Sequence, residues 1–149
     1  MNSRRVRGPT MPERMKQFIR FGLVGGSGVV VDMAVLFLLV DPRLGGWNLS
    51  IAKAFAAEAA IINNFVWNDI WTFREISAEN AGRRGHRTIL FCKFNLICLV
   101  GMGMNILLLN LQVRCWHINV YLANLIAIAL VSVWNFVMNV KFGWTTPKN

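Results

Sequence analysis

Long apolar runs alternate with short polar segments along this chain. The runs cover about residues 18–40, 49–72, 88–111 and 120–142. A helix rises 1.5 Å per residue, so about 20 residues cross the roughly 30 Å of hydrocarbon in a bilayer. The pattern therefore predicts an all-α membrane protein with four transmembrane helices.

Two short polar links divide the four runs into pairs. Asp41-Pro42-Arg43 and Gly45-Gly46 break the chain between the first two runs, and residues 114–119 separate the last two. Short links predict that each pair forms an antiparallel hairpin. Four tryptophans stand at predicted span ends and are expected to be interfacial anchors: Trp47, Trp71, Trp116 and Trp144.

The composition agrees with a membrane protein. Hydrophobic residues make up 55% of the chain, the mean hydropathy is +0.45, and charged residues reach only 15%. Soluble domains usually carry about 25% charged residues. The net charge of +9 could suggest a nucleic-acid ligand. However, the basic residues flank the apolar runs, so we predict no nucleic-acid partner.

Lysine and arginine gather on one side of the predicted membrane. The two flanks and the central segment carry Arg4, Arg5, Arg7, Arg14, Lys16, Arg20, Arg74, Arg83, Arg84, Arg87, Lys93, Lys141 and Lys148. The links carry only Arg43 and Arg114. Because cytoplasmic loops hold the excess of positive charge, both termini are predicted to be cytoplasmic. Residues 1–15 would form a basic cytoplasmic tail, and residues 16–145 the membrane domain.

The two predicted hairpins resemble each other in sequence. An offset of 73 residues aligns Phe18, Arg20, Phe21, Gly28 and Asp32 with Phe91, Lys93, Phe94, Gly101 and Asn105. An offset of 71 aligns Lys53, Asn64, Asn68 and Trp71 with Asn124, Asn135, Asn139 and Phe142. Each half has an even number of spans, so we predict a parallel repeat with its pseudo-axis along the membrane normal. Many transporters contain repeats, but duplicated scaffolds exist too.

Polar residues inside the runs need an explanation, because a charge at mid-span costs about 2.5 to 3.5 kcal/mol. At 100° per residue, Lys53, Asn64 and Asn68 share one face of the second run, while Glu58 and Asp69 share the opposite side. Simpler explanations stay open. The asparagines could join helices by hydrogen bonds, Lys53 could extend to the interface, and Glu58 could pair with Lys53. Glycines of the first run are expected to allow close helix contact: Gly25, Gly26 and Gly28.

Cations and amides cluster toward the predicted cytoplasmic side, which suits a phosphate at headgroup depth. General attraction to anionic lipid is the alternative. The sequence contains no Ser-His-Asp order, no metal-ligand spacing and no phosphate loop. We therefore predict no catalytic residue, no metal, no cofactor and no enzyme activity for this chain alone.

Two motifs resemble the GtrA-like family over residues 16–145. The first is Phe-Ile-Arg-Phe-Gly-Leu-Val-Gly-Gly at residues 18–26, and the second is Asn64-Phe65, Asn68 and Trp71-Thr72-Phe73-Arg74, with a weaker echo at 135–144. The resemblance implies translocation of a polyprenyl-phosphate-linked monosaccharide across the bacterial inner membrane for envelope polysaccharide glycosylation. Asn68-Asp69-x-Trp71-Thr72-Phe73 is similar to the membrane region of some polyprenyl- or dolichol-phosphate hexose synthases. A synthase would then be a separate chain.

Taken together, these observations predict a substrate-binding set inside the membrane. It comprises Arg20, Asp32, Lys53, Glu58, Asn64, Asn68, Asp69, Lys93, Asn135, Asn139 and Lys141. Many members of the family have a basic residue where this chain has Asp69, which leaves less positive charge there. The expected partners are the lipid-linked sugar, membrane lipids, a membrane glycosyltransferase and further copies of this chain, with a dimer favoured. Alternatives are a scaffold for a glycosyltransferase and a small proton-coupled exporter with Glu58 as proton carrier.

Overall fold

The computed structural model describes residues 10–83 and 85–145 and is all-helical over them. Its elements are α1 (Met11–Val40), α2 (Leu49–Trp67) continued by the π-helix η1 (Asn68–Thr72), α3 (Arg74–Glu79), α4 (His86–Cys115), and α5 (Val120–Met138) continued by the π-helix η2 (Asn139–Gly143). Four of the described helices are long and apolar enough to cross a membrane. The all-α prediction with four spans is therefore confirmed. Most of the predicted basic tail, together with Arg84 and Lys148, lies outside the described residues.

Local capping explains where the helices begin. Before α1, the Glu13 carboxylate accepts the Thr10 backbone N–H at 2.6 Å while the Thr10 side chain accepts from the Glu13 backbone, which forms a capping box. The Thr10 hydroxyl also donates to the Glu13 carboxylate at 3.0 Å. The two helices that follow the links, α2 and α5, are capped in the same way. The Asn48 side chain accepts the Ser50 N–H at 3.0 Å, and the Asn119 side chain accepts the Tyr121 N–H at 2.9 Å. The short links thus turn directly into α2 and α5, as the hairpin prediction requires.

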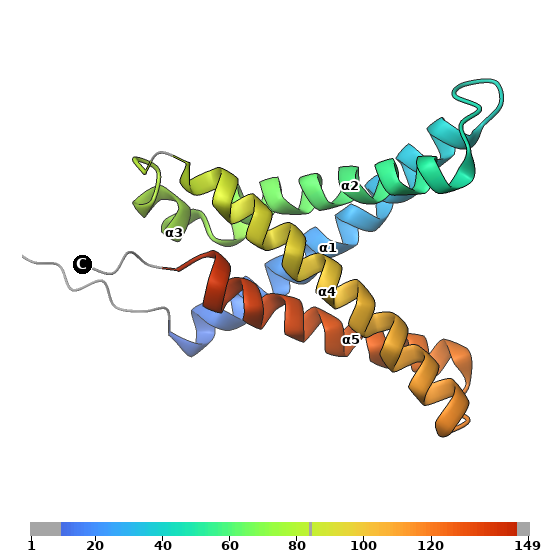
Figure 1. Cartoon of the computed structure of the whole chain (residues 1–149). Coiled ribbons are helices and arrows are strands. Elements are labelled where there is room, and N and C mark those ends of the chain that lie inside the picture. The colour runs from blue at the N-terminus through green and yellow to red at the C-terminus, as the bar shows by residue number, and fades with distance from the viewer. Residues whose placement is uncertain (1–9, 84, 146–149) are drawn as a thin grey trace, which may run out of the picture.

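The four long helices form two crossing hairpins (Figure 1). In Figure 1, α1 pairs with α2 and α4 pairs with α5, while both links lie at the end opposite α3. The hairpins meet near the α3 end, where Phe18 lies 5.2 Å from Phe136 and Phe65 lies 5.1 Å from Phe91, ring centre to ring centre. From there they diverge toward the links (Figure 1).

An aromatic cluster at the α3 end is the main buried core. It comprises Phe21, Phe73, Ile76, Leu90, Phe94 and Trp144. Phe73 and Trp144 stack with their ring centres 4.6 Å apart. Many large apolar side chains elsewhere are exposed, as expected where a lipid bilayer takes the place of a protein core. The core thus fixes the α3 end of the molecule and leaves the long apolar faces to lipid.

The prediction that Trp144 is an interfacial anchor is wrong, because its side chain is only 2% exposed and packs inside the core. η2 turns this residue inward just after the last predicted span. By contrast, Trp47, Trp71 and Trp116 are exposed, as an interfacial position requires.

Close helix contact depends on one glycine of the three predicted in the first span. A Cβ atom on Gly28 would lie 2.4 Å from Oδ1 of Asn64 on α2. A Cβ atom on Gly25 or Gly26 would meet nothing within 4 Å. The prediction is confirmed for Gly28 and wrong for the other two, which face away from the α1–α2 contact.

Candidate functional site

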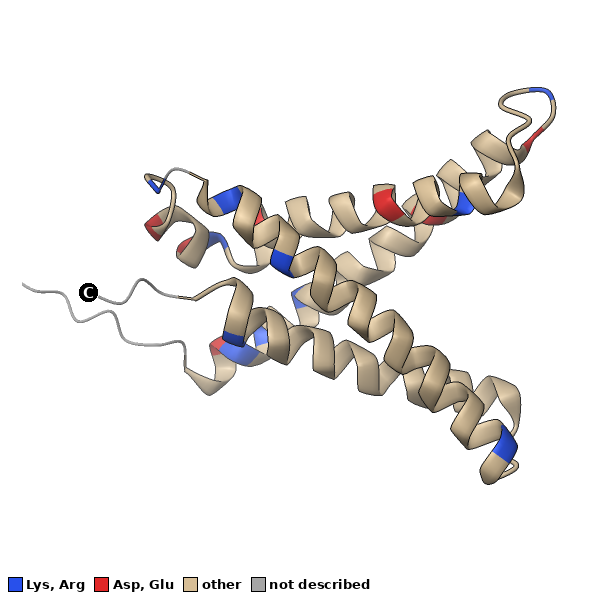
Figure 2. Ribbon diagram, viewed as in Figure 1, with Lys and Arg blue, Asp and Glu red and all other residues tan. Residues whose placement is uncertain are grey.

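Basic residues gather at the α3 end of the bundle (Figure 2). Arg20 of α1 donates from Nη1 to the carbonyl oxygen of Trp71 at 3.3 Å, and its guanidinium lies 5.4 Å from the centre of the Trp71 ring. Lys93 of α4 donates from Nζ to the carbonyl oxygen of Phe142 at 3.2 Å, and Lys141 lies 5.3 Å from the centre of the Phe142 ring. The fold therefore brings Lys93 and Lys141 together at η2 and places Arg20 at η1.

The four predicted asparagines lie inside helix contacts. Asn64 packs on Gly28, and Asn135 packs in the same way on Gly101, where a Cβ atom would lie 2.5 Å from its Oδ1. The other two, Asn68 and Asn139, begin the π-helices and are 1% and 0% exposed. Oδ1 atoms of three of them have no hydrogen-bond partner within the described residues: those of Asn68, Asn135 and Asn139.

The α1–α2 hairpin carries polar contacts at successive levels along α1. Beyond Arg20, the Ser27 hydroxyl accepts the Asn63 side-chain N–H at 2.9 Å. Further toward the link, Lys53 forms an ion pair with Asp32 at 2.5 Å. From Arg20 to Asp32 the α1 axis advances about 18 Å at 1.5 Å per residue. Polar and charged groups thus follow this hairpin over more than half the thickness of the hydrocarbon.

The α4–α5 hairpin has fewer charges at the matching positions. By the sequence offsets, Val100 stands for Ser27 and Trp134 for Asn63, while Asn105 and Asn124 stand for the ion-paired Asp32 and Lys53. The two hairpins therefore share their helix contacts and differ in the polarity of their interiors.

Glu58 joins the two hairpins. The Asn95 side-chain N–H donates to both of its carboxylate oxygens, at 3.1 and 3.3 Å. Asn95 lies on α4, so this bond crosses between the hairpins. The structure thus gives Glu58 an amide partner, while Lys53 takes Asp32 as its partner.

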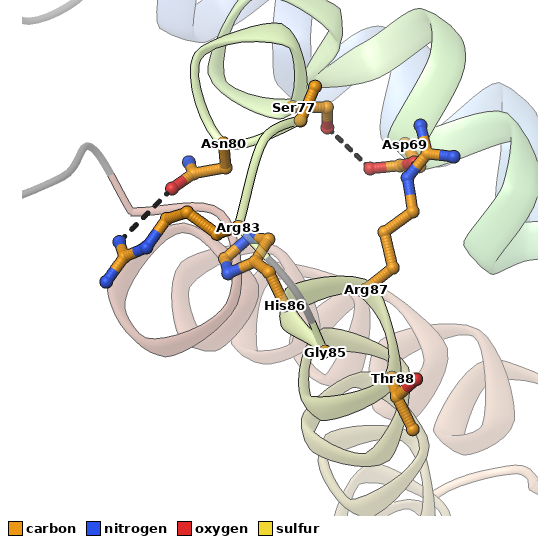
Figure 3. Close-up of a pocket in the computed structure, with 9 residues that line it drawn as sticks. Asp69, Ser77, Asn80, Arg83, Gly85, His86, Arg87 and Thr88 are labelled. Atoms are coloured by element: carbon orange, nitrogen blue, oxygen red, sulfur yellow. Dashed lines mark hydrogen bonds and ion pairs between the residues drawn. The ribbon is translucent and has the colours of Figure 1, made fainter.

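Asp69 anchors the segment around α3 (Figure 3). Its Oδ1 accepts hydrogen bonds from the Ser77 hydroxyl at 2.5 Å and from the Trp144 indole N–H at 3.2 Å. Its Oδ2 lies 3.4 Å from Nε of Arg87 at the start of α4. The residue is only 5% exposed. Asp69 therefore borders a cavity of about 280 Å³ with its oxygens already engaged by protein groups.

A larger cavity lies against the other side of η1, between it and the beginnings of α1 and α3. This charged cavity has a volume of about 510 Å³ and is lined by Glu13, Lys16, Gln17, Arg20, Ile70, Trp71, Thr72, Arg74 and Glu75. Thr72 is 3% exposed, and its hydroxyl has no hydrogen-bond partner within the described residues. Cationic residues and a threonine with an unpaired hydroxyl thus line the same cavity.

An apolar groove continues from the charged cavity. It has a volume of about 460 Å³ and is lined by Leu23, Val24, Ser27, Trp67, Ile70 and Trp71. Ile70 and Trp71 line both spaces, so the two adjoin. On the other hairpin, a second apolar groove of about 270 Å³ is lined by Lys93, Leu96, Ile97, Val100, Trp134, Met138 and Phe142.

Sequence reasoning did not single out Lys16, Thr72 or Arg74 as site residues. Lys16 entered only the charge count that set the orientation, whereas Thr72 and Arg74 also entered as part of a family motif. The Trp71-Thr72-Phe73-Arg74 motif was the signal that could have pointed to these two, but its geometry depends on the π turn of η1. Among the described residues, no cluster of His, Cys, Asp and Glu could hold a metal ion.

Comparison with known proteins gives a consistent result. The chain matches the family described as GtrA/DPMS, transmembrane domain, over residues 20–144. It is 34% identical over 130 residues to a dolichol-phosphate mannosyltransferase of Pyrococcus furiosus, covering 87% of this chain and 34% of that protein. It is 29% identical over 106 residues to an uncharacterized membrane protein, YngA, of Bacillus subtilis, covering 71% of this chain and 65% of that protein. The chain thus spans about a third of the first relative and less than two thirds of the second.

Proposed function

Because the chain belongs to the GtrA/DPMS transmembrane-domain family, we propose that it moves a polyprenyl-phosphate-linked monosaccharide across a membrane. The membrane is the bacterial inner membrane, both termini are cytoplasmic, and the sugar serves glycosylation of an envelope polysaccharide. The chain itself performs no catalysis and works beside a membrane glycosyltransferase.

The polar contacts along the α1–α2 hairpin carry this proposal. A sugar that enters hydrocarbon loses its hydrogen bonds to water, and each unpaired hydroxyl costs several kcal/mol in a medium that offers no partner. Ser27 with Asn63, and then Asp32 with Lys53, offer replacement donors and acceptors at successive depths. The prenyl chain can stay in the lipid while the sugar passes along this hairpin.

The test is a leaflet assay in reconstituted vesicles. A short-chain polyprenyl-phosphate hexose is added, and an enzyme that cannot cross the bilayer reports the sugar in the outer leaflet. We expect protein-dependent movement of the sugar. It should fall about tenfold or more in the double variant Asp32→Asn and Lys53→Met, because about 1.4 kcal/mol on the barrier already gives tenfold.

Two controls make the assay specific. The exchange Asp32→Lys with Lys53→Asp keeps an ion pair and should retain activity. The double variant Asn105→Leu and Asn124→Leu changes the matching positions of the α4–α5 hairpin and should have little effect. If folded wild-type protein fails to accelerate movement for several different hexoses, the translocation proposal is wrong.

A second candidate is a scaffold that recruits a glycosyltransferase without transport. It is favoured by the exposed Arg83 and Arg87 beside α3. It is also favoured by the mannosyltransferase relative, because the match covers only 34% of that protein's length. Charge reversal of Arg83 should then abolish co-purification of the enzyme while the Asp32 and Lys53 variants leave it intact. Sugar movement that depends on Asp32 and Lys53, with co-purification of the enzyme intact in the Arg83 variant, would favour translocation.

A further inference from the structure

We propose that the charged cavity binds the phosphate of the lipid-linked sugar through Lys16, Arg20 and Arg74, with Thr72 donating its hydroxyl. The adjoining apolar groove holds the first isoprene units of the same lipid. This inference rests on the proposed function for the identity of the lipid. It adds the residues that hold the phosphate, and it assigns the site to η1 instead of the Lys93 and Lys141 pair at η2.

The charges on the wall favour an anionic phosphate group. Three cations and two carboxylates, Glu13 and Glu75, line the cavity, which leaves one positive charge to attract a phosphate. The Glu13 carboxylate is already held by Thr10 in the capping box. Arg20 donates one hydrogen bond from Nη1 to the carbonyl oxygen of Trp71. Because a guanidinium has five N–H donors, Arg20 can keep this bond and bind a phosphate as well.

The Thr72 hydroxyl is the second, independent indication of a ligand. A buried hydroxyl without a partner costs about 1 to 3 kcal/mol, and the large majority of buried polar side chains in proteins have a partner. Thr72 lines the cavity, and its Oγ1 atom is buried and unpaired within the described residues. A phosphate oxygen bound in this cavity is the partner that we infer for its proton.

The α4–α5 hairpin lacks most of the residues that we propose to bind the phosphate. By the same sequence offsets, Gly143 stands for Thr72, Ile89 for Lys16 and Thr145 for Arg74, and only Lys93 preserves a cation, in place of Arg20. Its groove is smaller and is lined by apolar residues apart from Lys93 and Trp134. The duplicated fold therefore offers a comparison in which helix packing is shared and the phosphate-binding groups are not.

The apolar groove explains how the lipid chain would continue. It shares Ile70 and Trp71 with the charged cavity and extends along Leu23, Val24 and Trp67. The 30 residues of α1 span about 45 Å, more than the roughly 30 Å of hydrocarbon. Its first turns, with Lys16, therefore lie at headgroup depth, and the groove descends from them into hydrocarbon. An isoprenoid with a phosphate at its end matches this sequence of environments.

The experiment measures binding without transport. Purified full-length protein in lipid nanodiscs is titrated with farnesyl phosphate and with farnesol, which has the same chain and no phosphate. The quenching of tryptophan fluorescence reports binding, since Trp67 and Trp71 line the groove. The test variant is Lys16→Gln with Arg74→Gln, and neither side chain makes a hydrogen bond or ion pair to another described residue. The matched control is Lys93→Gln with Lys141→Gln.

We expect the test variant to weaken farnesyl phosphate about tenfold or more, since a charged hydrogen bond contributes about 1.5 to 3 kcal/mol. Farnesol should bind all variants equally. Thr72→Val should weaken the binding of farnesyl phosphate severalfold, and Thr72→Ser, which keeps a hydroxyl, should bind it like the wild type. Unchanged binding in the test variant, or an equal loss in the Lys93 and Lys141 control, would overturn the assignment. Farnesyl phosphate binding with this residue dependence but without sugar movement in vesicles would refute translocation alone.

Discussion

At the scale of single residues, an amide packed on a glycine recurs in both hairpins. Asn64 fills the space beside Gly28, and Asn135 fills the space beside Gly101. In each case a Cβ atom on the glycine would lie within about 2.5 Å of the amide oxygen. Small residues let membrane helices approach closely, and interhelical polar contacts add to the packing. The pair therefore sets the distance between the two helices of each hairpin.

Gly28→Ala should destabilise the protein, because the whole Asn64 amide would have to move. Overpacking of this kind costs about 1 to 3 kcal/mol. The measurement is the thermal midpoint of the purified protein in a mild detergent. Gly26→Ala is the control, since its Cβ would meet nothing within 4 Å and alanine favours a helix over glycine. Equal midpoints for the two variants would contradict a packing role for Gly28.

These residues also show how far the sequence could lead. The offsets of 73 and 71 paired Gly28 with Gly101 and Asn64 with Asn135 in the sequence. However, the three glycines of the first span look alike in sequence. Only the side of α1 on which each one lies shows that Gly28 contacts α2 and that the other two do not. The partners of Asp69 could not be predicted, because Trp144 is 75 residues away and reaches it only through the core.

At the scale of elements, the π-helices at the ends of α2 and α5 redirect the chain. The Phe73 N–H bonds to the carbonyl of Asn68, and the Trp144 N–H bonds to the carbonyl of Asn139, both at 2.8 Å. A π turn departs from the 100° step of an α-helix. Face assignments based on that step therefore fail beyond Asn68 and beyond Asn139, which is why the neighbours of Asp69 differ from the simple periodic pattern.

Asp69→Asn should loosen the attachment of α3 and the start of α4 to η1. The neutral amide loses the ion pair with Arg87 and the charge that strengthens the hydrogen bonds from Ser77 and Trp144, and a hydrogen bond to a charged group is worth about 1.5 to 3 kcal/mol. Trypsin should then cut at Arg83 or Arg87 faster than in the wild type. Glu79→Gln, an exposed change on α3, should leave the rate as it is. Unchanged cleavage of the Asp69 variant would mean that the aromatic cluster alone holds this segment.

At the scale of the whole molecule, two hairpins are joined at the α3 end and separate toward their links (Figure 1). The four spans could be predicted because run length depends only on membrane thickness. The crossing of the hairpins could not, because faces toward lipid and faces toward protein are equally apolar. The aromatic residues that join the hairpins look in sequence like any other lipid-facing side chains.

The placement of the basic residues predicts which end faces the cytoplasm. The α3 end carries most of the described lysines and arginines (Figure 2), and positive charge stays on the cytoplasmic side. Cys115 ends α4 beside the second link and is exposed. With Cys92 and Cys98 changed to serine, a maleimide that cannot cross membranes should label Cys115 in intact cells.

The matching variant tests the opposite end. Glu79→Cys on α3, with all three native cysteines changed to serine, should be labelled only after the membrane is permeabilised. The reverse pattern would place the charged cavity on the outer side, where it could not receive a lipid made in the cytoplasm. Under the translocation proposal, orientation therefore decides whether the cavity would be the loading end of the transport path or its exit.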